Sequence, residues 1–322
     1  MIVGVLIPRL ALTTAVGDRA ELLQSPVALA PEPGGAQRAP RPQGVVGEVS
    51  LAAEAFGLHP GMRLGEALAR CPRLILIPPD PAGVADLWER LLVRLESIGA
   101  AVEPERSGLA CFEARGLLRL HGGVEGVLRA ARTALRHPAR FGAAPSRFAA
   151  IAAATRARVR RPEIVAGAGM AGSSVAGAGM VGSGVAGAGR RGMGMAGTGM
   201  VGADDRERAR AYLAPLPVAL LRARPSLADL PGALERLGIT TLGELAAVPA
   251  PSLADRFGKR GLLAHELACG GDSALSPRPA SEYVREVLDL PEAVSGIQLE
   301  RGLGLLIDRL LARRERRGRT LR

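Results

Sequence analysis

Residues 99–123 read GAAVEPERSGLACFEARGLLRLHGG and contain the apolar segment on which the fold prediction rests. Leu109, Cys111 and Glu113 alternate with two apolar residues, so a strand here presents its side chains to opposite faces of a sheet. Both faces are largely apolar, which favours a strand covered on each side. Amphipathic helical patterns before and after this stretch predict a domain of mixed helices and strands.

The composition allows several compact domains and a polyanionic partner. The chain has 322 residues, of which 48% are hydrophobic, enough for two or three domains with substantial cores. Aromatic residues are only 2%, so aliphatic side chains must fill these cores. The net charge of +11 permits binding to nucleic acid. Because Lys259 is the only lysine, an arginine-rich and alanine-rich composition accounts for this charge equally well.

Cysteines and apolar runs predict the compartment. Cys71, Cys111 and Cys269 are odd in number, far apart and without a C-x-x-C pair, which favours free thiols over disulfides or a zinc site. Pro8 and Arg9 interrupt the apolar N-terminal run, which therefore reads as a strand and not as a signal peptide. No run reaches the ~20 apolar residues of a membrane span. We expect a cytoplasmic protein without a membrane partner.

Two segments carry a family resemblance. Residues 47–80 read GEVSLAAEAFGLHPGMRLGEALARCPRLILIPPD. They resemble the fingers segment of Y-family (UmuC/DinB-like) DNA polymerases, G-x-V-x-A-S-Y-E-A-R-x-F-G-V-x-x-G-M-x-x-x-E-A-x-x-x-C-P. The strand at 109–114 is similar to the palm strand of that family, S-I-D-E-A-F-L-D-V-T-G-L. Ten positions of the fingers pattern agree: Ser50, Ala53, Phe56, Gly57, Gly61, Met62, Glu66, Ala67, Cys71 and Pro72.

The resemblance implies carboxylates that this chain lacks. In active members, an Asp-Glu pair on the palm strand and aspartates in an opening h-h-D-h-D-x-F-F motif hold the catalytic metal ions. The expected carboxylate positions are here Leu6, Pro8, Gly108 and Leu109. We therefore expect no catalytic and no metal-binding residues, and no cofactor unless the chain is a polymerase that uses Mg²⁺. This pattern resembles the non-catalytic ImuB-like branch of the family.

The nucleotide-binding positions differ as well. In active members, a Tyr and an Arg of the fingers segment contact the incoming triphosphate. Leu51 and Glu54 occupy those places here. A carboxylate repels a phosphate, so this change also opposes nucleotide binding.

The resemblance implies an α+β fold of several parts. Residues 1–164 correspond to a ferredoxin-like palm with small fingers at about 26–72. Residues 205–277 correspond to a helical thumb with a helix-hairpin-helix, and 281–322 to the start of a little finger that is truncated. Between them, 165–204 repeat glycine, alanine and methionine in units of ten. This segment contains GAGMAG, but the tandem recurrence favours a disordered insertion over a dinucleotide-binding turn.

The thumb supplies the candidate DNA contacts. Exposed backbone N–H groups in a helical hairpin can bind a phosphate without reading bases. Two cations in the next turn, and an arginine at the first Lys of the family pattern G-I-S-x-N-K, add positive charge. Helical hairpins and basic helix ends also occur as packing units only. The candidates are Gly238, Ile239, Thr240, Thr241, Lys259, Arg260 and Arg147.

Three hypotheses about function follow. The leading one is a non-catalytic adapter in translesion synthesis and DNA repair, connected with the SOS response. It would bind primer-template DNA without sequence preference and lie at the nucleoid. C-terminal segments absent here would bind a replicative polymerase, a sliding clamp and recombinase-related partners. The second hypothesis is a residual polymerase that uses Glu103, Glu105 or Glu113 as substitute ligands. The third is a truncated, non-functional remnant.

Overall fold

The structure is a computed structural model that describes residues 1–31, 44–165, 202–279, 288 and 295–312. It comprises two compact units, Met1–Pro279 and Ala280–Arg322. None of the helices in these described ranges combines the length and the hydropathy that a membrane span requires.

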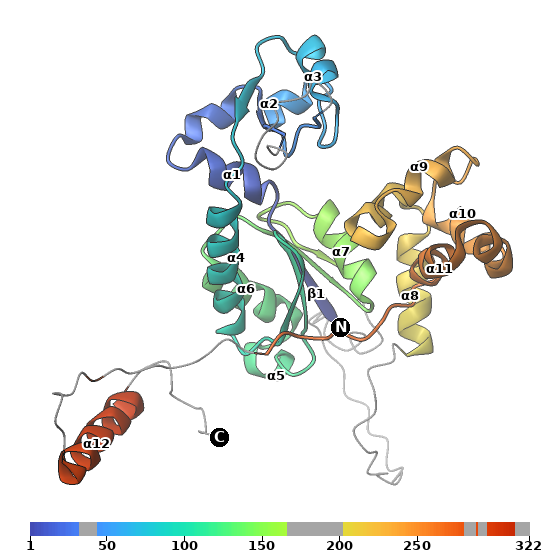
Figure 1. The fold of residues 1–322 in the computed structure, drawn as a ribbon. Coiled ribbons are helices and arrows are strands. Elements are labelled where there is room, and N and C mark those ends of the chain that lie inside the picture. Colours follow the sequence, from blue (N-terminus) through green and yellow to red (C-terminus); the bar gives the residue numbers. More distant parts are fainter. Residues whose placement is uncertain (32–43, 166–201, 280–287, 289–294, 313–322) are drawn as a thin grey trace, which may run out of the picture. The chain divides into compact units, whose positions relative to one another are not determined.

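A five-stranded sheet lies at the centre of the larger unit (Figure 1). The spatial order of its strands is β4-β5-β1-β6-β7. The first four strands pair antiparallel, and β7 pairs parallel with β6. The order β4-β5-β1-β6 with connecting helices is the ferredoxin-like arrangement, so the predicted α+β palm is confirmed. The strands are β1 (Ile2–Leu6), β4 (Val102–Arg106), β5 (Leu109–Glu113), β6 (Arg140–Ala144) and β7 (Glu163–Ile164).

Helices α4 (Pro81–Glu96) and α6 (Val124–Leu135) cover one face of this sheet (Figure 1). Asp80 begins α4 because its side chain accepts a hydrogen bond from the Gly83 N–H at 2.9 Å. Leucines and valines at helical spacing on both helices pack against Phe112 and Phe141 of the sheet. The short helix α5 (Leu118–His121) precedes α6. The aliphatic core expected from the composition is therefore present on this face.

Helix α7 (Arg147–Arg156) covers the opposite face and lies unusually close to it. A Cβ on Gly4 of β1 would lie 2.7 Å from the Ala150 carbonyl oxygen. A Cβ on Gly142 of β6 would lie 2.5 Å from the same oxygen. Only glycine leaves room for this approach. Half of the residues of α7 are alanines, and these alanines are fully buried, which lets the helix backbone sit against the strands.

The fingers form a separate small layer around the parallel pair of β2 (Val27–Leu29) and β3 (Ile75–Ile77). Ser50 organises this layer. Its buried hydroxyl accepts hydrogen bonds from the N–H groups of Val27 and Ala53 and donates to the Ser25 carbonyl at 2.8 Å. The helical elements here are α1 (Leu10–Val16), the 3-10 helix Ala20–Gln24, α2 (Leu51–Glu54) and α3 (Leu64–Arg70).

The helices after residue 202, α8 to α11, form the thumb, and leucines fill its core. Leu213, Leu234, Leu242 and Leu245 are fully buried there and share one cluster with Phe148 of α7. The thumb therefore packs directly on the palm. Its elements are α8 (Ala203–Leu213), the 3-10 helices Val218–Ala223 and Pro225–Leu227, α9 (Leu230–Glu235), α10 (Leu242–Ala247) and α11 (Ala250–Ala268).

The second unit contains one described helix, α12 (Gly296–Ala312). It coincides with the helix that the little-finger resemblance implies. The first residues of the predicted little finger, 281–287 and 289–294, and most of the repeat at 165–204 lie outside the described residues.

The close contact of α7 with the sheet gives a stability prediction. Gly142→Ala places a Cβ 2.2 Å from the Ala154 backbone nitrogen, which forces backbone shifts and should lower the free energy of unfolding by about 2 to 3 kcal/mol. Gly65→Ala in α3 is the control, because its Cβ meets no atom within 4 Å. We expect that variant to be unchanged or up to ~1 kcal/mol more stable. Urea denaturation measures both, and equal effects would contradict the argument.

Candidate functional site

The structure brings the four expected carboxylate positions together at one edge of the sheet. Leu6 and Leu109 are direct partners across β1 and β5. The Ile7 N–H donates to the Gly108 carbonyl at 2.7 Å, and Pro8 follows at once. The family register inferred from the sequence therefore places these positions side by side.

Apolar packing occupies this edge. Leu109 is buried in a small cluster with Cys111 and Ile151. Leu6 packs against the same cluster, as does Leu275 from the segment that follows the thumb. Leucine, proline and glycine offer no side-chain donor atom to a cation, so these residues do not fit a divalent metal ion. Within the described ranges, no three His, Cys, Asp or Glu residues are grouped closely enough to hold one.

Gly108 also has a backbone that disfavours a side chain. Its φ is +81°, and a Cβ there would lie 2.9 Å from the Ile7 carbonyl oxygen. An aspartate at this position would meet both the left-handed conformation and this contact. The edge would have to rearrange before it could hold a carboxylate at residue 108.

An ion pair between Arg9 and Glu54 connects the fingers to the chain that follows this edge, and the sequence did not predict it. Glu54, at the place of the family arginine, accepts a hydrogen bond from Arg9 Nη2 at 2.5 Å. Arg9 Nε donates to the Val49 carbonyl at 2.8 Å. Leu51, at the place of the family tyrosine, is 67% exposed. The charge reversal at Glu54 is thus compensated by an arginine 45 residues away, which sequence spacing could not indicate.

The hairpin between α9 and α10 has the expected turn but no unpaired N–H groups at its four predicted residues. Gly238 has a φ of +81° and donates to the Glu235 carbonyl, and Ile239 donates to the Leu234 carbonyl. The N–H groups of Thr240 and Thr241 donate to Glu244 Oε2 at 2.7 and 3.0 Å. The expectation of N–H groups open to a phosphate is therefore not met.

Glu244 takes the place that a phosphate would need. It forms a capping box with Thr241 at the start of α10. Hydrogen bonds from the Thr240 and Thr241 N–H groups hold the pKa of the Glu244 carboxyl below its usual range. The T-x-x-E spacing in the sequence is the local signal for this cap.

This cap predicts a pH-dependent change in the hairpin. Because the folded-state pKa of Glu244 is lowered, its stabilising contribution is present above the usual glutamate range near 4.3 and is lost as the pH falls through the lower value. The amide NMR signals of Thr240 and Thr241 should shift with that titration. In Glu244→Gln the titration should disappear. A midpoint at or above the usual glutamate value would contradict the hydrogen-bond argument.

Lys259 and Arg260 lie at a break inside α11. Gly258 has a φ of 60° and a ψ of −143°, which interrupts the helix before them. Both side chains are exposed. Arg260 Nε donates to the Ser226 carbonyl at 2.9 Å, and its guanidinium lies 3.8 Å from the Asp229 carboxylate. Arg260 thus lies near a carboxylate, whereas Lys259 forms no ion pair with the described residues and is the cation best placed to meet a phosphate.

Arg147 lies in a buried ion cluster, and this environment disfavours the predicted phosphate contact. Its Nη2 donates to Glu103 Oε1 at 2.5 Å, and its Nε donates to Glu105. Only 6% of Arg147 is exposed. The arginine is the first residue of α7, which places it beside the carboxylates of β4 and away from solvent.

The cluster extends into the thumb. Arg224 Nη1 donates to Glu105 Oε2 at 3.2 Å, and Arg224 Nη2 donates to both Asp272 oxygens at 2.6 Å. Asp272 also accepts the Phe148 N–H at 2.8 Å. We call Glu103, Glu105, Arg147, Arg224 and Asp272 the palm–thumb ion cluster. It joins β4 and α7 of the palm to the residues that flank the thumb helices.

Removal of one charge from this cluster should destabilise the protein strongly. Glu105 contacts both arginines, so Glu105→Gln leaves two buried cations undercompensated, and we expect a loss of about 3 kcal/mol in the free energy of unfolding. Glu66→Gln is the matched control, because it removes an exposed pair with Arg70 and should cost less than ~1 kcal/mol. Chemical denaturation compares the two. Equal losses would show that the cluster is not tightly coupled.

Comparison with known proteins shows which families and folds this chain is similar to. Residues 11–163 match the sequence profile of the impB/mucB/samB family. DNA polymerase IV of Dehalococcoides mccartyi is 27% identical over 290 residues, which are 88% of this chain and 64% of the relative. The chain is similar to the Y-family DNA polymerases. DNA polymerase IV of Moorella thermoacetica is 26% identical over 271 residues, 82% of this chain and 57% of the relative. The chain thus spans less than two thirds of the length of these relatives.

Solved structures show the same architecture. DinB from Sulfolobus solfataricus superposes with a TM-score of 0.58 at 14% identity, and the match covers 85% of this chain and 68% of that one. A Y-family DNA polymerase chimera of Dbh and Dpo4 gives a TM-score of 0.57 at 15% identity over 88% and 70% of the two chains. At these identities the likeness concerns the fold, and it agrees with the palm, fingers and thumb described above.

Proposed function

We propose that the chain is a non-catalytic Y-family homologue of the ImuB-like kind, which binds primer-template DNA as an adapter in translesion synthesis and repair. The observation that carries this proposal is the apolar edge formed by Leu6, Pro8, Gly108 and Leu109. Partners beyond DNA, namely a replicative polymerase, a sliding clamp and recombinase-related proteins, belong to the same proposal.

The chemistry of phosphoryl transfer supports the non-catalytic part. Two-metal catalysis needs carboxylates that hold two cations about 4 Å apart. Leu109 is instead 1% exposed and packs on Ile151 and Cys111. A carboxylate introduced at that position would lose its hydration without gaining a partner. The same packing that stabilises this edge thus opposes a metal site.

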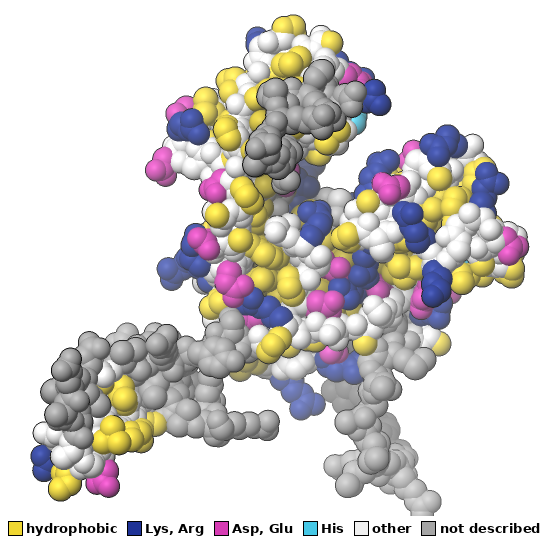
Figure 2. Space-filling model, in the orientation of Figure 1, with side chains coloured by type: hydrophobic (Ala, Val, Ile, Leu, Met, Phe, Trp, Pro, Cys, Tyr) yellow, Lys and Arg dark blue, Asp and Glu magenta, His cyan; other side chains and the backbone are white. Residues whose placement is uncertain are grey.

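The positive charge of the chain supports the DNA-binding part of the proposal. The chain carries a net charge of +11, and Lys and Arg side chains are spread over the visible thumb surface (Figure 2). Such cations bind phosphates without reading the sequence, and the affinity then falls steeply with salt. Lys259 is the contact we favour, because it is exposed at the helix break.

The names of the relatives favour a second candidate, a polymerase. Both compared sequences are named DNA polymerase IV. This candidate needs substitute ligands, and the positions of the three glutamates argue against them. Glu113 pairs with Ile2 at the other end of β5, about 13 Å along the strand from Leu109. Glu103 and Glu105 both bind Arg147.

One experiment separates these functions. We expect the full chain to bind a fluorescent primer-template duplex, with an affinity that falls linearly on a log-log salt plot, and not to extend the primer with Mg²⁺ or Mn²⁺. Lys259→Gln should weaken binding and reduce the salt slope by about one. Arg90→Gln on α4 is the control for loss of one exposed charge. Fluorescence anisotropy and primer extension on the same sample measure both activities.

Each outcome decides between the hypotheses. Extension that disappears in Glu113→Ala would overturn the non-catalytic proposal in favour of the polymerase. No binding at low salt, together with a non-cooperative thermal transition, would favour the third hypothesis of a non-functional remnant. Binding with an unchanged slope in Lys259→Gln would place the phosphate contacts elsewhere on the thumb.

A further inference from the structure

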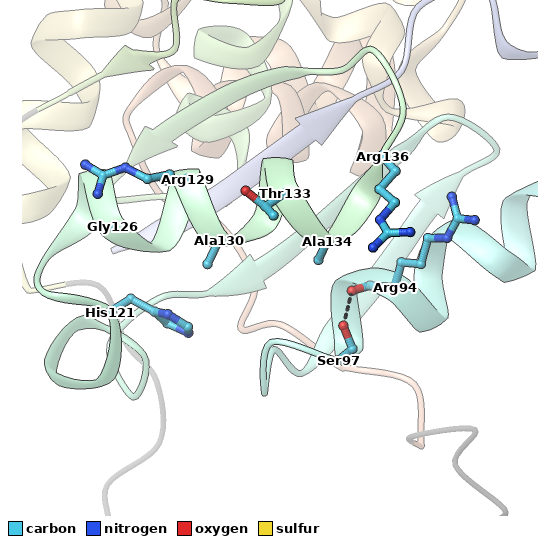
Figure 3. A pocket seen from close by; sticks show the side chains of 9 residues that line it. All are labelled: Arg94, Ser97, His121, Gly126, Arg129, Ala130, Thr133, Ala134 and Arg136. Carbon is cyan, nitrogen blue, oxygen red and sulfur yellow. Dashed lines mark hydrogen bonds between the residues drawn. The ribbon is translucent and has the colours of Figure 1, made fainter. Parts of the chain in front are cut away.

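A polar cavity lies on the helical face of the palm, away from α7 and the thumb. Its volume is about 660 Å³, and it lies between α4, α5 and α6 (Figure 3). This volume is within the usual range of small-molecule sites. Its lining residues are Arg94, Ser97, His121, Gly126, Arg129, Ala130, Thr133, Ala134 and Arg136.

Three arginines and no carboxylate line this cavity. Arg94, Arg129 and Arg136 are exposed side chains, and within the part of the chain that the structure describes they form no ion pair. Arg94 and Arg136 reach the same end of the cavity from different helices (Figure 3). Arg94 Nη1 is held there by the Leu135 carbonyl at 3.1 Å. The positive charge at this end therefore lacks a counter-ion from the protein.

The backbone at Arg136 supports a use for its side chain. Arg136 follows the last residue of α6 and has a φ of 48° and a ψ of 34°, the left-handed conformation that glycine adopts without strain. Arg9 is the other described residue besides glycine with a positive φ, and its side chain makes the ion pair with Glu54. A residue other than glycine in this conformation points to a function of the side chain.

The remaining lining residues leave space and add hydrogen-bonding groups. Ala130 and Ala134 point into the cavity, and their small side chains keep it open (Figure 3). Thr133 contributes a hydroxyl. At Gly126 a Cβ would lie 1.6 Å from the His121 carbonyl oxygen, so this glycine lets α5 approach α6 and brings His121 to the rim.

We propose that this cavity binds a ligand that carries a phosphate group and has the size of a nucleotide. Guanidinium groups match phosphate oxygens in geometry and charge, and three exposed arginines supply this charge along one open depression of the surface. A free nucleotide and a phosphate of a nucleic acid share this chemistry. The site lies on the sheet face opposite α7 and is independent of the proposed thumb contacts.

Isothermal titration calorimetry on the full chain tests the proposal with three probes. The probes are deoxyadenosine monophosphate, inorganic phosphate and a short single-stranded DNA. Deoxyadenosine monophosphate or the DNA should bind, and Arg136→Gly and Arg129→Gln should each weaken the binding at least tenfold. Arg136→Gly is informative because glycine adopts the left-handed backbone conformation of residue 136 without strain. The melting temperature of this variant should therefore equal or exceed that of the unmodified protein. Arg119→Gln removes an exposed arginine of α5 outside the cavity and should leave the binding unchanged.

The probes also distinguish the source of the phosphate. Tighter binding of the mononucleotide identifies a free nucleotide as the ligand, and tighter binding of the DNA identifies a nucleic acid. Either result supports the proposal if the Arg136→Gly substitution abolishes the binding. Three results would overturn it: no heat with any probe at millimolar concentration, equal weakening by Arg119→Gln, or an acidic peptide that binds more tightly than the phosphates with the same dependence on Arg136.

Discussion

The contact between α7 and the central strands is the constraint on which the rest of the structure depends. Gly4 and Gly142 leave no side chain between the helix and the sheet, so the helix backbone rests on β1 and β6. This contact places Arg147, the first residue of α7, beside the carboxylates of β4. It also directs the Phe148 N–H to Asp272. The thumb is therefore joined to the palm by charges whose positions the two glycines determine.

The segment after the thumb contacts both the apolar edge and the palm–thumb ion cluster. Leu275 of the segment after the thumb packs against the cluster that contains Leu109, and Ser276 donates its N–H to Glu103 at 2.5 Å. The end of the sheet where the family resemblance implies carboxylates is thus used here for contact between the palm and the segment after the thumb. Burial raises the pKa of the Cys111 thiol in this region, which keeps the thiol neutral and suited to an apolar environment.

Local patterns in the sequence predicted much of the fold. The alternation at 109–113 and the apolar run at 2–7 identified β5 and β1, because strand periodicity is local. The family pattern named Leu6 and Leu109 as expected carboxylate positions, and the structure pairs these two residues across β1 and β5. Local sequence patterns could not predict the contacts of Arg147, because its partners lie more than 40 residues away in the chain. The closed N–H groups of the hairpin depend on the capping box of Thr241 and Glu244, which the T-x-x-E spacing could have indicated.

The residues after the thumb have a consequence for solubility. β4 is the edge strand of the sheet, and an open edge offers unpaired backbone groups to strands of other molecules. The Arg278 N–H donates to the Val102 carbonyl at 3.0 Å, and the Arg278 guanidinium binds Glu96 at 2.6 Å. This segment therefore shields part of the edge from intermolecular pairing. A chain that ended at residue 271 would leave this part of β4 exposed as a template for aggregation.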